Sequence, residues 1–343
     1  HCINSAYDKK FDTENIAELV KKDDAYYLEL FHGSTIAFKD MALQLMPRLL
    51  CRALDKTGEK RDAMILVATS GDTGKAALEG YCDVDHIRIK VFYPVDGVSR
   101  VQKLQMATQT GANVDVCAIR GNFDDAQTGV KKIFADASIA KELDEKGVFL
   151  SSANSINWGR LAPQIVYYVS AYCDLLAQGA VMPGEEIDVC VPTGNFGNIF
   201  AAYIAKLMGL PICRLVCASN RNNILTDFLR TGTYDRNRHF YTTMSPSMDI
   251  LISSNLERLL YTVAGAEKTA AYMRALGTDG KYTVDADVKA KIDESFLGYF
   301  CDEELTKKTI RDTFDTDHYL CDTHTAVGLA AARQYIAEHG GAR

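Results

Sequence analysis

The stretch Ala63-Met-Ile-Leu-Val-Ala-Thr-Ser-Gly-Asp-Thr-Gly-Lys-Ala-Ala-Leu-Glu-Gly-Tyr-Cys82 decides the fold class of this chain. It begins with an apolar run, Ala63–Ala68, that is typical of a buried strand. A turn with two glycines follows, and Thr73–Cys82 has the pattern of a helix. A short apolar strand that leads through a turn into a helix is the repeating unit of α/β proteins with a mostly parallel sheet.

The same alternation continues on both sides of this stretch. The other strand-like runs are Tyr26–Leu30, Ile87–Tyr93, Asn113–Ala118, Val148–Leu150, Ile187–Val191 and Ile212–Val216. The helical patterns are Met41–Leu54, Val98–Thr108, Asp124–Ala135, Leu161–Leu176 and Phe196–Leu207. From about residue 222 onward we expect helices and no further strands, with Ala326–Ala337 as one of these helices.

Length and composition indicate a globular protein of two domains. At about 150 residues per domain, 343 residues correspond to two domains. A content of 47% hydrophobic and 24% charged residues is ordinary for a globular chain. The 45 acidic residues exceed the 38 basic residues by 7, which argues against nucleic acid as a partner. Because no run of about 18 apolar residues occurs, we expect no membrane span.

The ten cysteines are scattered singly, without C-x-x-C pairs and without histidines at metal-ligand spacing. We therefore expect free thiols in a reducing compartment and no metal site. Cys117 and Cys190 lie in strand-like runs, where a thiol behaves as a small hydrophobic group. The chain opens with His1 and shows no basic-then-apolar leader, so we predict a cytoplasmic location.

Three glycine-containing loops follow strand-like runs, which is where ligands bind in α/β sheets. The first is Ala68–Lys75, which contains Ser70–Gly74. Its Gly71–Lys75 portion is similar to part of a phosphate-binding P-loop, but the glycine spacing differs and Ala76 stands where Ser or Thr is required. What remains is a turn of backbone N–H groups and hydroxyls that suits a carboxylate or a phosphate. The alternative is that the loop only caps the next helix, through Ser70, Asp72 or Thr73.

The second loop, Pro192-Thr-Gly-Asn-Phe-Gly-Asn198, separates a strand from a helix. Gly194 and Gly197 allow a ligand to approach the backbone closely, and the N–H groups at the start of the next helix favour an anion. Glycine in such a turn also serves backbone conformation alone. Asn195 and Asn198 add neutral donors, so we interpret the loop as an anion site, with phosphate as the expected anion.

The third loop, Phe31-His-Gly-Ser-Thr-Ile-Ala-Phe-Lys-Asp40, ends at the start of a helix. Lys39 is flanked there by Ala37 and Phe38, so its surroundings are partly apolar. Such surroundings lower the pKa of an amine and favour its reaction with an aldehyde. The alternative is an exposed lysine paired with Asp40.

Four segments together resemble threonine synthases in content and in order. These segments are Phe31–Asp40 (the third loop), Ala68-Thr-Ser-Gly-Asp-Thr-Gly74, Ser151-Ser-Ala-Asn-Ser-Ile-Asn157 and Pro192–Asn198 (the second loop). The resemblance extends to Asp322-Thr-His-Thr-Ala-Val-Gly328. Threonine synthases are pyridoxal 5'-phosphate (PLP) enzymes of fold type II, the tryptophan-synthase-β-like family. The resemblance implies two three-layer α/β domains with mostly parallel sheets flanked by helices, and PLP in the cleft between them.

The resemblance also implies roles for residues near the cofactor. Lys39 matches the lysine that binds PLP covalently and acts as the catalytic base. The loop that holds the cofactor phosphate matches Gly194, Asn195, Phe196, Gly197 and Asn198. Thr325 matches the residue whose hydroxyl faces the pyridine nitrogen. The alternative is that Thr323 or Thr325 only caps the helix that follows.

The substrate-binding positions follow from the same resemblance. The loop that holds the substrate carboxylate matches Ser70, Gly71, Asp72, Thr73 and Gly74. Candidates for the substrate phosphate are Asn154, Ser155 and Arg160, because arginine can bind a phosphate through two parallel hydrogen bonds. The chain departs from the family where the family usually has proline, at Ser34, Arg100 and Thr323. It is also short at both ends, so we expect family segments at the N- and C-terminus to be missing.

The resemblance implies a large PLP-binding domain, residues 1–55 plus 158–343, and a small domain, residues 56–157, that carries the Ser70–Gly74 loop. It implies conversion of O-phospho-L-homoserine and water to L-threonine and phosphate, by a monomer or a homodimer. A phospho-lyase that releases phosphate and a 2-oxo acid shares every motif, and a catalytically impaired PLP-binding homologue is a further alternative. A dinucleotide-dependent dehydrogenase is disfavoured, because G-x-G-x-x-G with a downstream acidic residue is absent.

Overall fold

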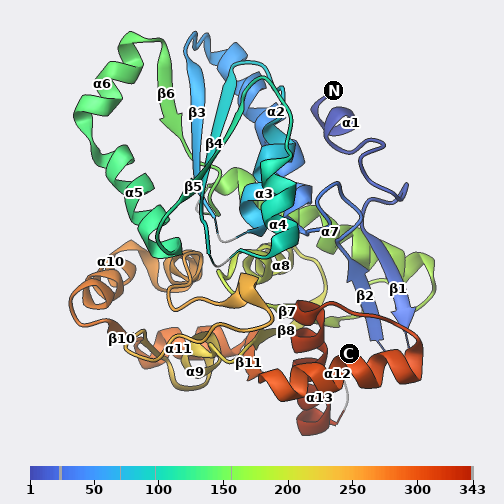
Figure 1. The fold of residues 1–343 in the computed structure, drawn as a ribbon. Coiled ribbons are helices and arrows are strands. Elements are labelled where there is room, and N and C mark those ends of the chain that lie inside the picture. The colour runs from blue at the N-terminus through green and yellow to red at the C-terminus, as the bar shows by residue number, and fades with distance from the viewer. Residues whose placement is uncertain (23–24, 70, 97, 156, 341–343) are drawn as a thin grey trace. The chain divides into compact units, whose positions relative to one another are not determined.

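The computed structural model describes residues 1–22, 25–69, 71–96, 98–155 and 157–340, and Figure 1 labels their helices and strands. Contacts divide the chain into two compact units, His1–Val20 with Tyr27–Pro163 and Lys21–Tyr26 with Gln164–Arg343. The first unit contains a four-stranded parallel sheet, and the second contains a three-stranded parallel sheet. Both units are therefore of the α/β class that the sequence predicts.

In the first unit the strands of the main sheet lie in the order β5-β4-β3-β6. Their bounds are β3 Asp62–Ala68, β4 Ile87–Pro94, β5 Val114–Ile119 and β6 Val148–Ser151. The helices of this unit are α1 Cys2–Ala6, α2 Lys39–Thr57, α3 Asp72–Tyr81, α4 Arg100–Ala107, α5 Phe123–Ala135 and α6 Ala137–Glu145. A separate two-stranded sheet pairs β1 Glu18–Lys22 with β2 Ala25–Glu29.

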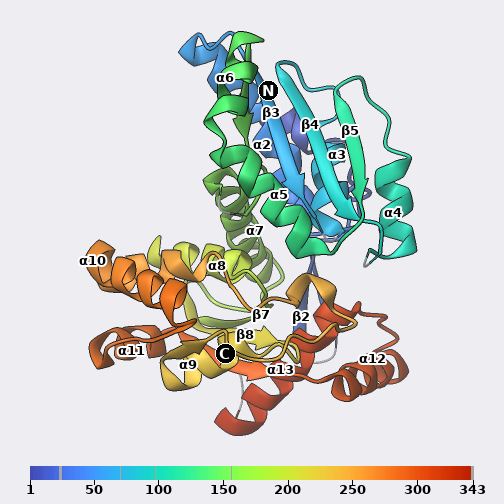
Figure 2. The same cartoon turned by 60° about the vertical axis from the view of Figure 1, so that its left-hand side comes forward.

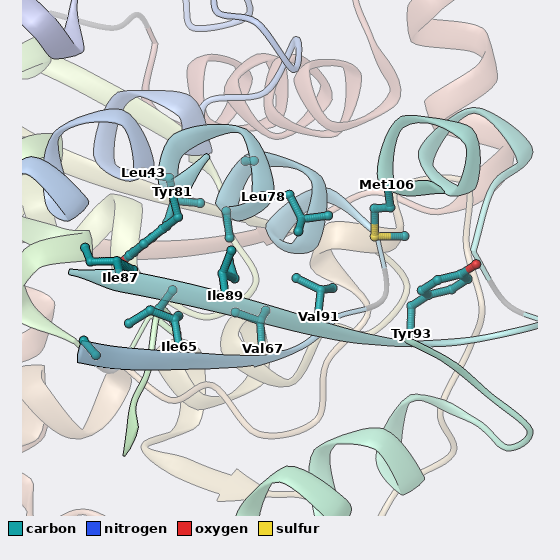
Figure 3. Close-up of a cluster of buried hydrophobic side chains, with 14 of the residues drawn as sticks. Leu43, Ile65, Val67, Leu78, Tyr81, Ile87, Ile89, Val91, Tyr93 and Met106 are labelled. Carbon is teal, nitrogen blue, oxygen red and sulfur yellow. The ribbon is translucent and has the colours of Figure 1, made fainter. Parts of the chain in front are cut away.

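Alternating residues of β3 and β4 build the core on both faces of this sheet. Ile65, Val67, Ile89 and Val91 point toward α2 and α3, and Figure 3 shows them beside Leu78 and Tyr81 of α3. On the opposite face Leu66 and Ala68 pack against Ala126 and Val130 of α5, and Figure 2 shows α5 and α3 on opposite sides of the sheet. The sheet is thus covered by helices on both faces, which makes a three-layer unit.

The division of the chain into units by contacts differs from the domain division expected from the sequence in where it places α2. Residues 27–55, expected in the large domain, cluster with the first unit. The physical cause is the close approach of α2 to α3, because a Cβ on Gly80 would lie 2.1 Å from the carbonyl oxygen of Leu43. The two divisions rest on different criteria, contacts and family resemblance, so the functional domain assignment stays a prediction.

In the second unit the strands lie in the order β11-β8-β7. Their bounds are β7 Ile187–Pro192, β8 Ile212–Ser219 and β11 Phe296–Phe300, and β9 Thr233–Asp235 pairs antiparallel with β10 Lys281–Thr283. The division between the units falls within α7 Trp158–Ala177. The later helices are α8 Gly197–Leu207, α9 Ile224–Thr231, η1 Pro246–Met248, α10 Leu256–Thr278, α11 Ala286–Asp293, α12 Glu303–Asp317 and α13 Thr323–His339.

The expectation that strands stop near residue 222 is wrong. Strand β11 pairs in parallel with β8, from Phe296 opposite Leu215 to Phe300 opposite Ser219. Its middle residue is Gly298, where a Cβ would lie 2.9 Å from Cα of Thr226 in α9. A short segment with a central glycine carries a weak strand signal, and tertiary packing decides its conformation.

The expected strands before residue 222 are confirmed. The seven expected strand-like runs are strands, with ends that differ by a few residues. The ten cysteines are free thiols. Among the described helices, none combines the length and the apolar character needed to cross a membrane.

Two of the three positions at which the resemblance implies a proline have a shared geometry. Arg100 and Thr323 are the first residues of α4 and α13, and the preceding residues Ser99 and Asp322 are extended, with φ −60°, ψ 150° and φ −72°, ψ 170°. Proline suits this position because the first N–H groups of a helix have no intrahelical partner, and because proline requires an extended residue before it.

We therefore expect Arg100→Pro and Thr323→Pro each to raise the free energy of unfolding by about 0.4–1 kcal/mol, through a less flexible unfolded chain. The control, Lys103→Pro, removes the 2.9 Å hydrogen bond that the Lys103 N–H donates to the Ser99 carbonyl, and should lower that free energy by about 3 kcal/mol. Urea unfolding of the three variants measures these changes. Destabilisation by both first-turn prolines would contradict the expectation.

Candidate active site

Lys39, the first residue of α2, is buried, with 7% of its surface exposed. Its Nζ lies 3.5 Å from Oδ2 of Asp72 and 4.5 Å from the centroid of the Phe38 ring. Burial lowers the pKa of Lys39; Asp72 opposes this effect, and the positive charges of Arg160 and Lys75 add to it. A lowered pKa increases the fraction of neutral amine, which is the nucleophilic and basic form.

The turn before Lys39 is fixed by the buried carboxylate of Asp40. Thr35 donates to Asp40 from its backbone N–H at 2.8 Å and from its hydroxyl at 2.6 Å. Gly33 is required beside it, because a Cβ there would lie 2.6 Å from Oδ2 of Asp40. Asp40 is therefore the partner of Thr35, and the alternative of an exposed lysine paired with Asp40 is wrong.

The loop after β3 is held by Thr69, whose Oγ1 accepts hydrogen bonds from the N–H groups of Gly71 and Gly74, both at 2.9 Å. Gly71 is the N-cap of α3 and makes no side-chain capping bond. Neither Asp72 nor Thr73 caps α3, because both lie within its first turn. Ser70, also expected in this loop, lies outside the described residues.

Asp72 joins the loop to its surroundings. Its Oδ1 accepts a hydrogen bond from Nε2 of Gln102 at 2.6 Å and lies 3.6 Å from Nζ of Lys75. The N–H groups of Gly71 and Gly74 already donate to Thr69. Binding of a substrate carboxylate by this loop therefore depends on the other residues of the loop, and it stays a prediction. Within the first unit, the structure does bring Asp72 beside Lys39.

Arg160, near the start of α7, is 3% exposed, and burial lowers its pKa to about 10. Its Nη1 donates to the carbonyl oxygen of Ala153 at 2.6 Å, in the loop after β6. Asn154 and Ser155 lie partly buried in the same loop. The guanidinium is close enough to influence Lys39, so the structure brings Arg160 into the cluster around that residue.

This cluster carries an excess of positive charge. Its cationic groups are Lys39, Lys75 and Arg160, whereas its carboxyl groups are Asp72 and Asp40. Burial raises the pKa of Asp40, which weakens its negative charge further. Because buried charges need compensation, the surplus of cations suits an anionic ligand.

In the second unit the loop after β7 leads into the first turn of α8. Gly194 is required by packing, because a Cβ there would lie 2.8 Å from the carbonyl oxygen of Ser247 and 3.0 Å from Cα of Met248. Phe196 is fully buried and has a left-handed backbone, with φ 66°. The backbone of the loop therefore lies at the start of α8, and the first N–H groups of that helix favour an anion.

The side chain of Asn198 is oriented by two tyrosines of α7. The hydroxyls of Tyr167 and Tyr168 donate to its Oδ1 at 2.5 and 2.6 Å. Both tyrosines are buried, and burial raises the pKa of each above its ordinary value. With the oxygen of Asn198 engaged, its NH₂ group is the donor left for another partner.

Sequence reasoning missed the segment that supports this loop. Ser253 donates from its hydroxyl to the carbonyl oxygen of Gly194 at 2.9 Å, and Asn255 donates to the carbonyl oxygen of Asn195 from its backbone N–H at 3.0 Å. Asn255 is fully buried. The run of Ser and Asn before α10 is a signal for a structured loop, but it does not show which carbonyls accept these bonds.

Thr325 lies in the first turn of α13, and Asp322 is the N-cap of that helix. The Thr325 hydroxyl donates to Oδ2 of Asp322 at 2.5 Å. Burial raises the pKa of Asp322, but hydrogen bonds from His324 and Thr325 outweigh it and hold the pKa at about 2. The alternative that Thr323 or Thr325 is the cap of this helix is wrong.

His324 connects this turn to the region of the Gly194–Asn198 loop in the same unit. Its Nε2 accepts a hydrogen bond from the backbone N–H of Ser247 at 3.2 Å, and Ser247 contacts Gly194 as described above. The structure therefore brings Gly194–Asn198 and the start of α13 to the same η1 turn. Lys39, Asp72 and Arg160 belong to the first unit.

The family profile "Pyridoxal-phosphate dependent enzyme" matches residues 11–342. The human protein "Threonine synthase-like 1" is 43% identical over 341 residues, which is 96% of this chain and 45% of that protein. A threonine synthase of Pseudomonas aeruginosa is 44% identical over 311 residues, which is 90% of this chain and 64% of that enzyme. The chain thus spans about half to two thirds of the length of these relatives.

Solved structures of threonine synthases share the fold. The PLP-bound enzyme of Brucella melitensis matches with a TM-score of 0.89 and 41% identity, over 97% of this chain and 69% of that chain. The yeast enzyme matches with a TM-score of 0.90 and 35% identity, over 98% of this chain and 69% of that chain.

We expect Gly194→Ala to weaken PLP binding by about tenfold or more, because forcing a methyl group into close contact with Ser247 and Met248 costs roughly 1–3 kcal/mol. The matched control is Gly277→Ala in α10 of the same unit, where a Cβ would meet nothing within 4 Å; its PLP affinity should equal that of the wild type. Fluorescence titration with PLP measures both. Unchanged affinity in Gly194→Ala would show that the loop does not contact the cofactor.

Proposed function

Because this chain belongs to the family of pyridoxal-phosphate-dependent enzymes of fold type II, with PLP as cofactor, we propose that it is a threonine synthase. In this proposal it converts O-phospho-L-homoserine and water to L-threonine and phosphate. The observation that carries the proposal is the buried Lys39, with its lowered pKa, in a cluster with surplus positive charge. The substrate bears a phosphate and a carboxylate, and this cluster suits anions.

We assign three sets of cofactor contacts from the resemblance. Lys39 holds PLP covalently, the Gly194–Asn198 loop holds its phosphate, and Thr325 faces the pyridine nitrogen. The fit is supported by the NH₂ group of Asn198, which the two tyrosines leave as a donor. When bound, PLP supplies an electron sink that stabilises negative charge on the substrate carbon next to the amino group.

The protein residues then provide acid–base chemistry and charge. The neutral amine of Lys39 removes the proton from the substrate Cα, which its lowered pKa favours at neutral pH. Asp72, 3.5 Å away, stabilises the ammonium that results. Arg160 stabilises the phosphate group as it departs, and the loop Gly71–Gly74, with Asn154 and Ser155, contributes to substrate binding.

The chain is also 43% identical to a protein named threonine synthase-like 1, and a second function is therefore tested beside the first. A phospho-lyase would eliminate phosphate from the same class of substrate and release a 2-oxo acid. Both functions use the same buried lysine and the same anion-binding groups. The fate of the carbon skeleton therefore distinguishes them.

We expect the chain, loaded with PLP and incubated with O-phospho-L-homoserine, to release threonine and phosphate in equal amounts. Mass spectrometry of the products, with a phosphate assay, measures both. Lys39→Ala should lower the rate by about 10²–10⁴-fold or more, because it removes the general base, whereas Lys90→Met, which removes a lysine paired with Asp115, should retain the wild-type rate. Equal amounts of phosphate and a 2-oxo acid would support the phospho-lyase, and the absence of phosphate release would contradict both functions.

Borohydride reduction tests the assignment of Lys39 directly. After reduction of the PLP-loaded chain, peptide mapping should place the phosphopyridoxyl group on Lys39, because Lys39 combines burial with a lowered pKa. Lys75 is the internal control, since it is also buried and lies beside the same aspartate. Label on Lys75 in place of Lys39 would overturn the assignment.

A further inference from the structure

Two buried lysines share one carboxylate in the first unit. Nζ of Lys39 lies 3.5 Å from Oδ2 of Asp72, and Nζ of Lys75 lies 3.6 Å from Oδ1 of the same residue. Lys39 and Lys75 are 7% and 8% exposed, and the Asp72 side chain is 20% exposed. Neither oxygen of this carboxylate is fully open to water, so its charge depends on the neighbouring cations.

Lys75 differs from Lys39 in a second contact. Its Nζ also donates to the carbonyl oxygen of Thr35 at 2.8 Å. Thr35 in turn donates twice to Asp40 at the start of α2. Lys75 therefore ties α3 to the turn that precedes Lys39, and this turn is held between Lys75 on one side and Asp40 on the other.

The two contacts of Lys75 matter because covalent attachment of the cofactor would take the Lys39 ammonium away from Asp72. A partly buried carboxylate that loses its cation is destabilised by several kcal/mol in an unfavourable case. With Lys75 in place, Asp72 keeps a cation and its hydrogen bond from Gln102. Asp72 therefore has one cation that would leave and one that would stay.

We propose that Lys75 is a positioning residue that keeps Asp72 paired and holds the Thr35 turn, so that Lys39 can leave Asp72 and react with the cofactor. The proposal rests on the role assigned to Lys39 under the proposed function. It adds a residue that neither the sequence motifs nor the acid–base scheme requires.

The charges that face Lys39 give the expected direction of change. These charged groups are Asp72, which favours its ammonium form, and Arg160 and Lys75, which disfavour it. In Lys75→Met, Asp72 would hold Lys39 without competition from Lys75, and the repulsion from Lys75 would be lost. Lys39 would then titrate at higher pH and react more slowly with PLP at neutral pH. Lys75→Arg keeps the charge and should restore most of the wild-type behaviour.

Competitive labelling with trace acetic anhydride, across a pH series and without cofactor, measures the titration of Lys39 by mass spectrometry of its peptide. We expect the midpoint in Lys75→Met to rise by about one pH unit, which is about a tenfold lower fraction of neutral amine below the midpoint. The rate of PLP loading at neutral pH should fall by a similar factor. Lys90→Met, which removes an exposed lysine paired with Asp115 at 2.6 Å, should match the wild type.

An unchanged Lys39 midpoint in folded Lys75→Met would overturn the proposal. If that variant does not fold, the wild type provides the test: after PLP loading, Lys75 should stay protected from acetic anhydride, and labelling of Lys75 as fast as exposed Lys90 would overturn it. The titration uses neither cofactor nor substrate. A chain that forms no threonine would therefore contradict the proposed function without deciding this experiment, and the converse also holds.

Discussion

A primary amine buried at the start of α2 is the constraint on which this site depends. Removing an ammonium group from water is costly unless a partner compensates it, and Lys39 has Asp72 at 3.5 Å. Two further cations, Lys75 and Arg160, oppose that compensation. Burial and these opposing charges together leave Lys39 with a lowered pKa. Contacts among α2, α3 and α7 in the first unit keep these groups in place.

The second unit supplies a site of a different kind. Around Gly194–Asn198 the structure offers backbone and amide donors rather than side-chain cations. Ser253 and Asn255 hold the loop carbonyls, and two tyrosine hydroxyls hold the oxygen of Asn198. Neutral donors at the start of a helix can bind a phosphate without the desolvation cost of a buried cation. The buried amine of Lys39 in the first unit and the neutral donors of the Gly194–Asn198 loop in the second are each compatible with membership in a PLP-dependent family.

The sequence predicts much of this arrangement because local patterns carry it. Apolar strand runs, glycine turns and helical periodicity locate β3, β7 and the helices that follow them, and the apolar neighbours of Lys39 indicate its burial. The sequence does not predict what depends on distant packing. Strand β11 has a central glycine and acquires its conformation from β8, and the pairing of Lys39 with Asp72 joins residues that are 33 positions apart. The capping of α13 by Asp322 and the role of Ser253 and Asn255 depend in the same way on contacts that no spacing rule contains.

A crystal structure of the PLP-loaded chain tests the central claim most directly. The account predicts continuous density between Nζ of Lys39 and the cofactor, the cofactor phosphate within hydrogen-bond distance of the Gly194–Asn198 backbone, and Asp72 still paired with Lys75. Density that joins the cofactor to another lysine, or a cofactor phosphate bound away from Gly194–Asn198, would contradict it.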